Sequence, residues 1–245
     1  MKEKKLYAIS DHIGCMSQAN CDYVIKHNPR IDSSRIEVCP NCIDIHNISV
    51  STQKRDEIRN KYGIPINKKV FVYGGNLGKP QGIDFLIECL KSQKNNNAIY
   101  FLIIGTGTEF TKLDNYAKMS EQNNLKVMST LPRADFETLV NTCDVGLIFL
   151  DKCFTIPNFP SRLLSYMQAK IPVLAVTDVN TDVGKVIVDG GFGWWCESND
   201  IKNFKQKIED IFKDNLIEKG IKARAYLIDN YSAEKSYEII TKHMN

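Results

Sequence analysis

A glycine-rich segment, GGNLGKPQG from Gly74 to Gly82, carries residue types suited to binding an anion. It follows a short apolar run and precedes a segment of helical period. Glycines let backbone N–H groups approach a phosphate closely, and the N-terminus of the following helix adds partial positive charge. Lys79 could supply a full charge. The spacing matches neither a Walker A loop nor a complete GxGxxG fingerprint, so a tight turn explains the segment equally well.

Two further segments lie between an apolar run and a helical one. GTGTE, Gly105 to Glu109, lacks the third glycine of a dinucleotide fingerprint, so a structural turn explains it as well as a phosphate or sugar contact does. In FTIPNFPSRLL, Phe154 to Leu164, Ser161 can cap the following helix and Arg162 then falls in its first turn. A cation there opposes the helix dipole, which favours a bound anion over a solvated arginine.

Motifs of several other chemistries are missing from the sequence. We find no HExxH, no EF-hand loop, no Ser/His/Asp motif and no RNA-binding signature, and the four histidines lie outside the main α/β run. Cys39 and Cys42 form a CxxC, but no second CxxC or nearby His pair completes a zinc set, and the motif does not open a helix. We therefore expect no metal site and no redox site.

The segments that must position these residues alternate apolar runs with helical ones from residue 70 onward. Such alternation is typical of βαβ units, so we expect an α/β fold with a parallel sheet and helices on both faces. Ligands of such sheets bind at the carboxyl ends of the strands, where all three segments fall. The predicted strands are Val70 to Gly74, Ala98 to Gly105, Leu125 to Met128, Val145 to Leu150, Pro172 to Val176 and Gly193 to Cys196.

Composition sets the broad class. The chain has 245 residues, 43% hydrophobic and 25% charged, which is typical of a soluble globular protein. Its net charge of +3 is too small to indicate a surface that binds nucleic acid. The longest apolar runs are far shorter than the roughly 18 to 20 residues of a membrane span, and the first residues do not form a secretory signal. We expect a cytoplasmic protein whose eight cysteines are reduced.

Five segments, taken together and in order, resemble one known family. They are VCPNCID (Val38 to Asp44), YGGNLGKPQGIDFLIE (Tyr73 to Glu88), LIIGTGTE (Leu102 to Glu109), LPRADFETLVNTCDVGLIFL (Leu131 to Leu150) and PSRLLSYMQAKIPVLA (Pro160 to Ala175). The first resembles V-x-P-N-G-I-D, the second G-R-L-x-x-x-K-G-x-D-x-L-I, and the third L-x-I-x-G-x-G. The family is that of GT-B glycosyltransferases of the family 4 type, and the resemblance is to their C-terminal, Rossmann-like donor-binding domain.

The resemblance implies transfer of a sugar from a nucleotide diphosphate donor, with retention at the anomeric carbon and without a metal or other cofactor. The resemblance favours UDP over GDP as the nucleotide of the donor. The pattern P-S-R-x-x-x-Y-M from Pro160 is similar to that of bacterial transferases that build surface polysaccharides on glycan or lipid-linked acceptors. Such a transferase could contact the inner face of the membrane. The implied donor-binding residues are Gly75, Asn76, Lys79, Gly105, Thr106, Gly107, Leu131, Pro132, Arg133, Ser161, Arg162, Leu163 and Ser165.

The chain departs from the family pattern at four positions. The family's paired glutamates fall on Pro157 and Ser165, and its Arg and Lys of the first glycine loop fall on Asn76 and Gln81. Lys79 and Arg162 remain as the nearest cations.

The resemblance also implies a domain organisation. We expect residues 1–45 to be a remnant of the N-terminal acceptor domain with its junction, 46–230 the donor domain, and 231–245 a helix that packs back across the interdomain cleft. Only about 40 residues precede the junction, whereas the family carries there a domain of about 100 residues or more. We expect catalytic residues to lie in the missing domain or a partner chain, and this chain alone to transfer little sugar.

Two other functions fit the same sequence. A non-catalytic partner subunit or docking module would explain the loss of both family glutamates. A GT-B sugar-nucleotide epimerase shares the fold. We expect Trp194, Trp195, Tyr100 and Phe101 to serve core or rim packing rather than sugar stacking.

Overall fold

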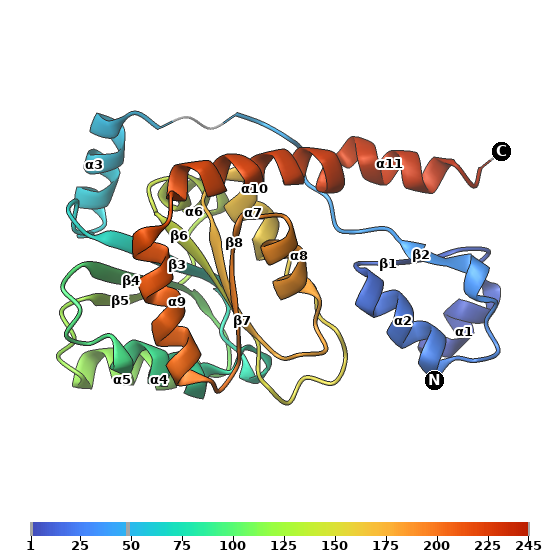
Figure 1. Ribbon diagram of the computed structural model, residues 1–245, viewed down its shortest axis with the longest axis horizontal. Helices are drawn as coiled ribbons and strands as arrows, with labels where there is room; N and C mark the ends of the chain where they lie inside the picture. The colour runs from blue at the N-terminus through green and yellow to red at the C-terminus, as the bar shows by residue number, and fades with distance from the viewer. Residues whose placement is uncertain (1, 48–49, 245) are drawn as a thin grey trace.

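The computed structural model, which describes residues 2–47 and 50–244, contains a six-stranded parallel sheet in the order β5-β4-β3-β6-β7-β8 (Figure 1). The predicted parallel α/β sheet is therefore confirmed, including its short last strand. The strands are β3 (Lys69–Asn76), β4 (Ile99–Thr106), β5 (Leu125–Met128), β6 (Val145–Phe149), β7 (Val173–Thr177) and β8 (Gly193–Glu197).

Helices cover both faces of this sheet, because successive strand residues bury opposite sides. In β3, Val70 and Val72 belong to one buried cluster, and Phe71 and Tyr73 belong to the other. The first cluster packs against α3 (Thr52–Lys61), α6 (Arg133–Val140), α7 (Arg162–Gln168), α8 (Val183–Asp189) and α10 (Leu216–Tyr231). The second packs against α4 (Ile83–Ser92), α5 (Phe110–Met119) and α9 (Ile201–Lys213).

A small N-terminal unit lies beside the large one (Figure 1). Its strands β1 (Ile13–Cys15) and β2 (Ile36–Val38) pair in parallel, and α1 (Lys2–Ile9) and α2 (Gln18–His27) accompany them. The unit has its own small apolar core, formed by Ile13, Cys15, Cys21 and Val24. Hydrogen bonds from α2 connect it to the large unit: Ala19 N–H donates to Asp182 Oδ2 at 2.9 Å, and Asn20 Nδ2 donates to the Pro157 carbonyl at 2.7 Å.

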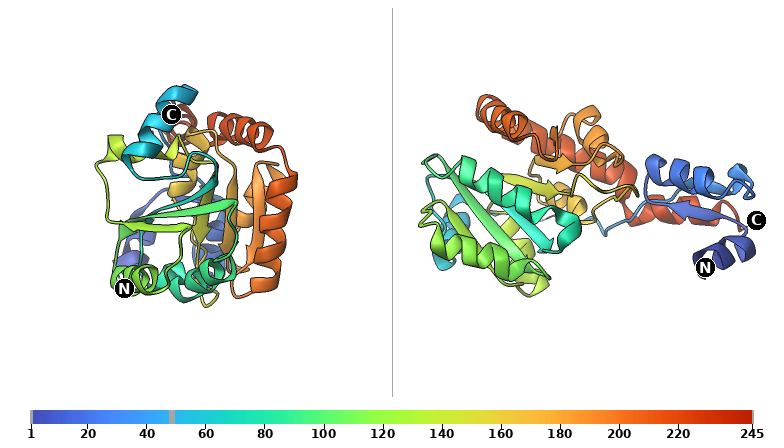
Figure 2. Two further views of the ribbon diagram at one scale, coloured as in Figure 1. Left: turned by 90° about the vertical axis from the view of Figure 1, so that its left-hand side faces the viewer. Right: turned by 90° about the horizontal axis from the view of Figure 1, so that it is seen from below.

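The last helix, α11 (Ala233–Thr241), leads from the large unit to the small one (Figure 2). Ser232 caps it by accepting a hydrogen bond from Lys235 N–H. Ser236 Oγ donates to the Pro40 carbonyl at 3.3 Å, and Ile43 pairs with Ser232 in an isolated bridge. The junction after β2 and the start of α11 are thus held together. None of the described helices is both long and apolar enough to cross a membrane.

Candidate functional site

A pocket of about 470 Å³ opens at the carboxyl ends of β3 and β4, beside α6 and α7. β3 has β4 on one side and β6 on the other, so the strand order reverses between β3 and β6. Open α/β sheets bind ligands at such a switch point. The pocket is lined by Gly74, Gly75, Asn76, Ile104, Thr130, Leu131, Arg133, Phe136, Ser161, Arg162 and Ser165.

Arg162 is the central cation of this pocket. Its guanidinium lies over the Tyr73 ring, 4.4 Å from the ring centroid, and forms no ion pair with the described residues. Its Nη1 is buried and has no hydrogen-bond partner in the part of the chain that the structure describes. A buried charged donor without an acceptor is costly, so this arrangement favours an anion that would take up the free hydrogen bonds.

Arg133 adds a second positive charge at the rim. Its Nε donates to Glu137 Oε1 at 2.7 Å, one helical turn along α6, and its side chain is 79% exposed. Among the described residues, those that line the pocket include no aspartate or glutamate. The pocket is therefore electropositive, and Arg162 is its less solvated cation.

Close backbone packing shapes the glycine loop at the pocket floor. Gly75 has φ +117°, a backbone conformation that residues with a side chain rarely adopt. Gly105 is its partner on the neighbouring strand β4. A Cβ on Gly105 would lie 1.9 Å from the Gly75 carbonyl oxygen. Leu77 N–H also donates to the Thr106 carbonyl at 2.8 Å. The end of β4 therefore holds the loop that carries Gly75.

Two amide side chains occupy the positions where the resembled family has cations. Asn76 Nδ2 donates to Gln81 Oε1 at 3.2 Å, and Gly78 N–H donates to the same oxygen at 3.0 Å. Gln81 is buried, so it stabilises the turn rather than reaching the pocket. The neutral pair leaves the positive charge of the pocket to Arg162 and Arg133.

Tyr166 supports the glycine loop from below. Its hydroxyl accepts a hydrogen bond from Gly74 N–H at 3.1 Å and donates to the Leu147 carbonyl at 3.2 Å, so it bridges β3 and β6. Burial raises the pKa of Tyr166, although the nearby Arg162 opposes the shift, and the hydroxyl stays neutral.

We expect Tyr166→Phe to lower the free energy of unfolding by about 1 to 3 kcal/mol, because it leaves a buried N–H and a buried carbonyl without a partner. Chemical denaturation followed by circular dichroism measures this. Tyr237→Phe is the matched control, since Tyr237 is 69% exposed on α11. Equal effects of the two substitutions would contradict the bridging role.

Seven of the predicted donor-binding residues line the pocket, and six do not. Those that do are Gly75, Asn76, Leu131, Arg133, Ser161, Arg162 and Ser165; those that do not are Lys79, Gly105, Thr106, Gly107, Pro132 and Leu163.

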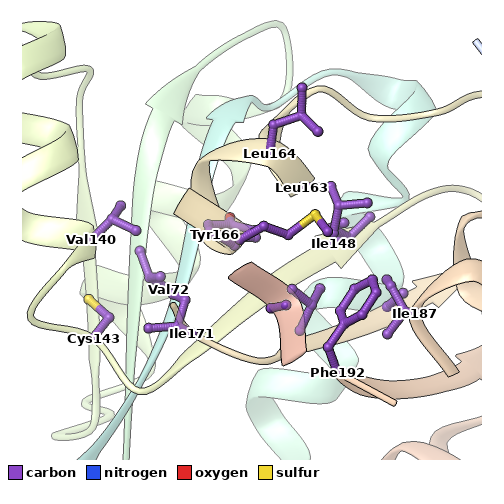
Figure 3. Close-up of a cluster of buried hydrophobic side chains, with 14 of the residues drawn as sticks. Val72, Val140, Cys143, Ile148, Leu163, Leu164, Tyr166, Ile171, Ile187 and Phe192 are labelled. Atoms are coloured by element: carbon purple, nitrogen blue, oxygen red, sulfur yellow. The ribbon is translucent and has the colours of Figure 1, made fainter. Parts of the chain in front are cut away.

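Most of the six predicted residues that do not line the pocket lie in the core, pack against the glycine loop or face solvent. Leu163 is fully buried in the core, so its side chain does not line the pocket (Figure 3). Gly105 to Gly107 pack against the glycine loop instead of lining the pocket. Lys79 is exposed at the start of a short 3-10 helix, Lys79–Gln81. Ser161 lies at the N-cap of α7, but its hydroxyl makes no capping hydrogen bond and remains available to the pocket.

Four lining residues were not among the predicted donor-binding residues. Thr130 follows β5, Ile104 belongs to a strand buried on both faces, and Gly74 lies in β3 at the start of the glycine-rich segment. Phe136 reads as an ordinary apolar residue of α6, yet its ring lies against Gly74, where a Cβ would approach to 2.3 Å. Of these residues, only those at the ends of strands could have been predicted to lie near a ligand, because open parallel sheets bind ligands there.

A second pocket of about 600 Å³ adjoins the first and shares Arg133, Ser161 and Ser165 with it. Its other walls are the junction after β2 and α11, through Cys39, Pro40, Asn41, Cys42, Ile43, Leu164, Ser236 and Ile240. The two pockets are therefore neighbours, and the second lies between the large unit and the chain segments that lead to the small one.

Comparisons with known proteins agree with this architecture. The chain superimposes on the crystal structure of Anabaena Alr3699/HepE in complex with UDP with a TM-score of 0.80, at 17% identity, over 98% of this chain and 65% of that one. A glycosyltransferase from Rickettsia africae ESF-5 gives a TM-score of 0.78 at 19% identity, over 99% of this chain and 67% of that one. Both likenesses are in the fold.

Sequence comparison extends the match. The chain is 30% identical over 171 residues to the probable glycosyltransferase WbjE of Pseudomonas aeruginosa, which covers 70% of this chain and 42% of WbjE. It is 23% identical over 180 residues to the putative colanic acid biosynthesis glycosyl transferase WcaI of Escherichia coli (strain K12), covering 72% of this chain and 43% of WcaI. The chain thus spans less than half the length of these relatives.

The family model described as glycosyl transferases group 1 matches residues 54–233. This range contains the whole central sheet and every residue that lines the first pocket. The chain belongs to the group 1 family of glycosyl transferases, with the fold of GT-B glycosyltransferases.

Proposed function

We propose that this chain binds the nucleotide-sugar donor of a glycosyltransferase in the pocket at β3, β4 and α7, and that the donor is a UDP-sugar. The observation that carries the proposal is Arg162, a cation without an ion pair among the described residues, in a pocket whose described lining holds no carboxylate. A diphosphate supplies the missing acceptors. The structures of HepE with UDP and with UDP-glucose support UDP as the nucleotide.

The lining divides into a polar and an apolar side. Ile104, Leu131 and Phe136 offer apolar surface for the base, whereas Gly75, Ser161 and Arg162 face the diphosphate. Negative charge grows on the diphosphate as the sugar leaves. Preorganised donors aimed at that charge stabilise the transition state more than the bound donor, which is how such a site accelerates transfer. We propose that Arg162 and the backbone N–H groups of the glycine loop do this, with retention at the anomeric carbon.

The second pocket suggests where the acceptor approaches. It opens directly beside the diphosphate side of the first pocket, because Ser161 and Ser165 line both. We propose that a glycan or lipid-linked acceptor enters between the junction and α11, and that the reaction serves bacterial surface polysaccharide synthesis. The printed description of WcaI, a colanic acid biosynthesis glycosyl transferase, supports this class.

Calorimetric titration with UDP, GDP and NAD, each with and without EDTA, tests the donor site. We expect UDP to bind with a dissociation constant below about 1 mM, equivalent to about 4 kcal/mol of binding free energy, and more tightly than GDP or NAD. EDTA is expected to leave UDP affinity unchanged, since the positive charges come from arginines. A failure of UDP to bind at millimolar concentration would overturn the proposal.

We expect the chain alone to bind donor but to transfer sugar slowly or not at all. The matches cover 42% of WbjE and 43% of WcaI, so residues from the remaining length are proposed to complete the site. Turnover at ordinary enzyme rates of about 1 to 1,000 per second by this chain alone would contradict that part of the proposal.

A further inference from the structure

A cluster of metal-ligating side chains lies far from the donor pocket, where the small unit meets the end of α11. His12 precedes β1, Glu37 lies in β2, and His243 follows α11. One ligand atom from each residue lies within 4.8 Å of the others. We propose that this cluster binds one divalent transition-metal ion, of which Zn²⁺ is the best match, and that the ion fastens α11 to the small unit.

The three side chains already converge. The rings of His12 and His243 stack with centroids 3.6 Å apart and planes inclined by 17°. His243 Nε2 lies 2.5 Å from Glu37 Oε1. Imidazole nitrogens and a carboxylate oxygen are ligands that Zn²⁺ binds at about 2.0 to 2.2 Å, which places neighbouring ligand atoms about 3.3 Å apart. Because a metal ion lies in the plane of each imidazole that binds it, at least one of the two stacked rings would turn on binding.

The Glu37 carboxylate already holds a cationic partner in the structure. Lys242 Nζ contacts Glu37 Oε2, and His243 Nε2 lies against Glu37 Oε1. A metal ion in the cluster would bind the same carboxylate. Lys242 is the competing cation, and because its side chain is 52% exposed on a flexible stem, it can move into solvent when an ion takes its place.

The ligand atoms that converge are those of His12, Glu37 and His243, and the Cys39 thiol, next to β2, is not one of them. The site is thus of the imidazole and carboxylate type. The ligands come from both ends of the described chain, so they form no recognisable metal-binding motif in the sequence. For this reason the sequence by itself predicted no metal site.

An ion here would have a mechanical effect. It would tie the loop before β1, the strand β2 and the tail after α11 together, and would add to the contacts that Lys242 and His243 make with Glu37 and to the contact between Ser236 and Pro40. Because α11 also lines the second pocket, through Ser236 and Ile240, the ion would fix one wall of that opening. This inference does not depend on the identity of the donor.

Zinc titration of the full chain, first stripped with a chelator, tests the site. We expect about one Zn²⁺ to bind per chain, and His12→Ala and His243→Ala each to weaken binding at least about tenfold, since even losing a residue that only orients a ligand costs about 10- to 100-fold. His27→Ala is the matched control, because His27 is an exposed histidine on α2 that stacks on Tyr23. The paired substitution Cys39→Ser and Cys42→Ser should leave affinity unchanged.

A second measurement reports the mechanical effect without relying on affinity. Hydrogen exchange of α11 and β2 is expected to slow when Zn²⁺ is added to the wild-type chain and to stay unchanged in the His12→Ala and His243→Ala double variant. Zinc binding that survives this double variant, or that His27→Ala or the cysteine substitutions remove, would overturn the proposal. No binding to the stripped wild-type chain would overturn it too.

Discussion

Arg162→Ala is expected to weaken UDP binding by about 1.5 to 3 kcal/mol, or about 10- to 150-fold in the dissociation constant, the usual contribution of hydrogen bonds to a charged group. Arg162 lines the donor pocket, forms no ion pair with the described residues and rests on the Tyr73 ring. Removing it leaves the diphosphate side of the pocket without its least solvated cation. Calorimetric titration of the wild-type and variant chains with UDP measures the change.

Three further variants show whether the guanidinium itself is responsible. Arg162→Lys should lose part of the affinity, because an ammonium keeps the charge but not the two-pronged geometry. Arg133→Ala should have a smaller effect, since its side chain is 79% exposed and paired with Glu137. Lys79→Ala, outside the pocket lining, should change the affinity less than about threefold, as expected of a solvated, screened charge.

The result also separates two functions. A donor site must respond to Arg162→Ala, whereas a docking module with the same fold need not. Unchanged UDP affinity in Arg162→Ala, in a variant that still unfolds at the wild-type temperature, would contradict the donor-site proposal and favour the docking module.

Arg59→Ala is expected to lower the free energy of unfolding by about 3 to 5 kcal/mol, the usual cost of removing one partner from a buried ion pair. Arg59 has no exposed surface. Its Nη2 donates to Asp144 Oδ2 at 2.8 Å, its Nε to the Thr142 carbonyl at 2.9 Å, and its Nη1 to the Lys68 carbonyl at 3.2 Å. It therefore links α3 to the starts of β3 and β6. Denaturant titration measures the loss.

Arg55→Ala provides a control on the same helix and with the same carboxylate. Arg55 Nη2 lies 3.8 Å from Asp144 Oδ1, and its side chain is 35% exposed, so its removal should cost no more than about 1 kcal/mol. The Arg59→Ala and Asp144→Asn double variant should lose less than the sum of the two single changes, because the two residues share one interaction. Additive losses would show that Arg59 acts through its carbonyl contacts alone.

Helix α3 shows why part of the fold could not be predicted. Its sequence, TQKRDEIRNK, has a single apolar residue, Ile58, so it carries no apolar stripe for the pattern to detect. The helix is held by Ile58 and by the buried guanidinium of Arg59, an arginine that pattern reasoning assigns to the surface. The strands were predictable for the opposite reason: they are buried on both faces and read as continuous apolar runs.

The candidate site divides in the same way. Glycine-rich turns and Arg162 stand out in the sequence because their residue types are unusual at those places. Leu163 illustrates what a motif cannot predict. It lies in α7 between Arg162 and Ser165, which were predicted to bind the donor together with it, yet its side chain points into the core. Adjacent residues of a helix point about 100° apart, so a motif cannot say which of its members faces the ligand without the helix orientation.

By itself, the sequence determined the strands, the helical segments between them, the glycine turns at strand ends and the family, because these depend on local periodicity and on short motifs. Only the tertiary structure decided which residues meet. It placed Arg162 over Tyr73 with no ion pair to any described residue, paired Arg133 with Glu137, and brought His12, Glu37 and His243 together from both ends of the described chain. Such contacts depend on how distant elements pack against one another, and the spacing of residues along the chain does not encode that packing locally.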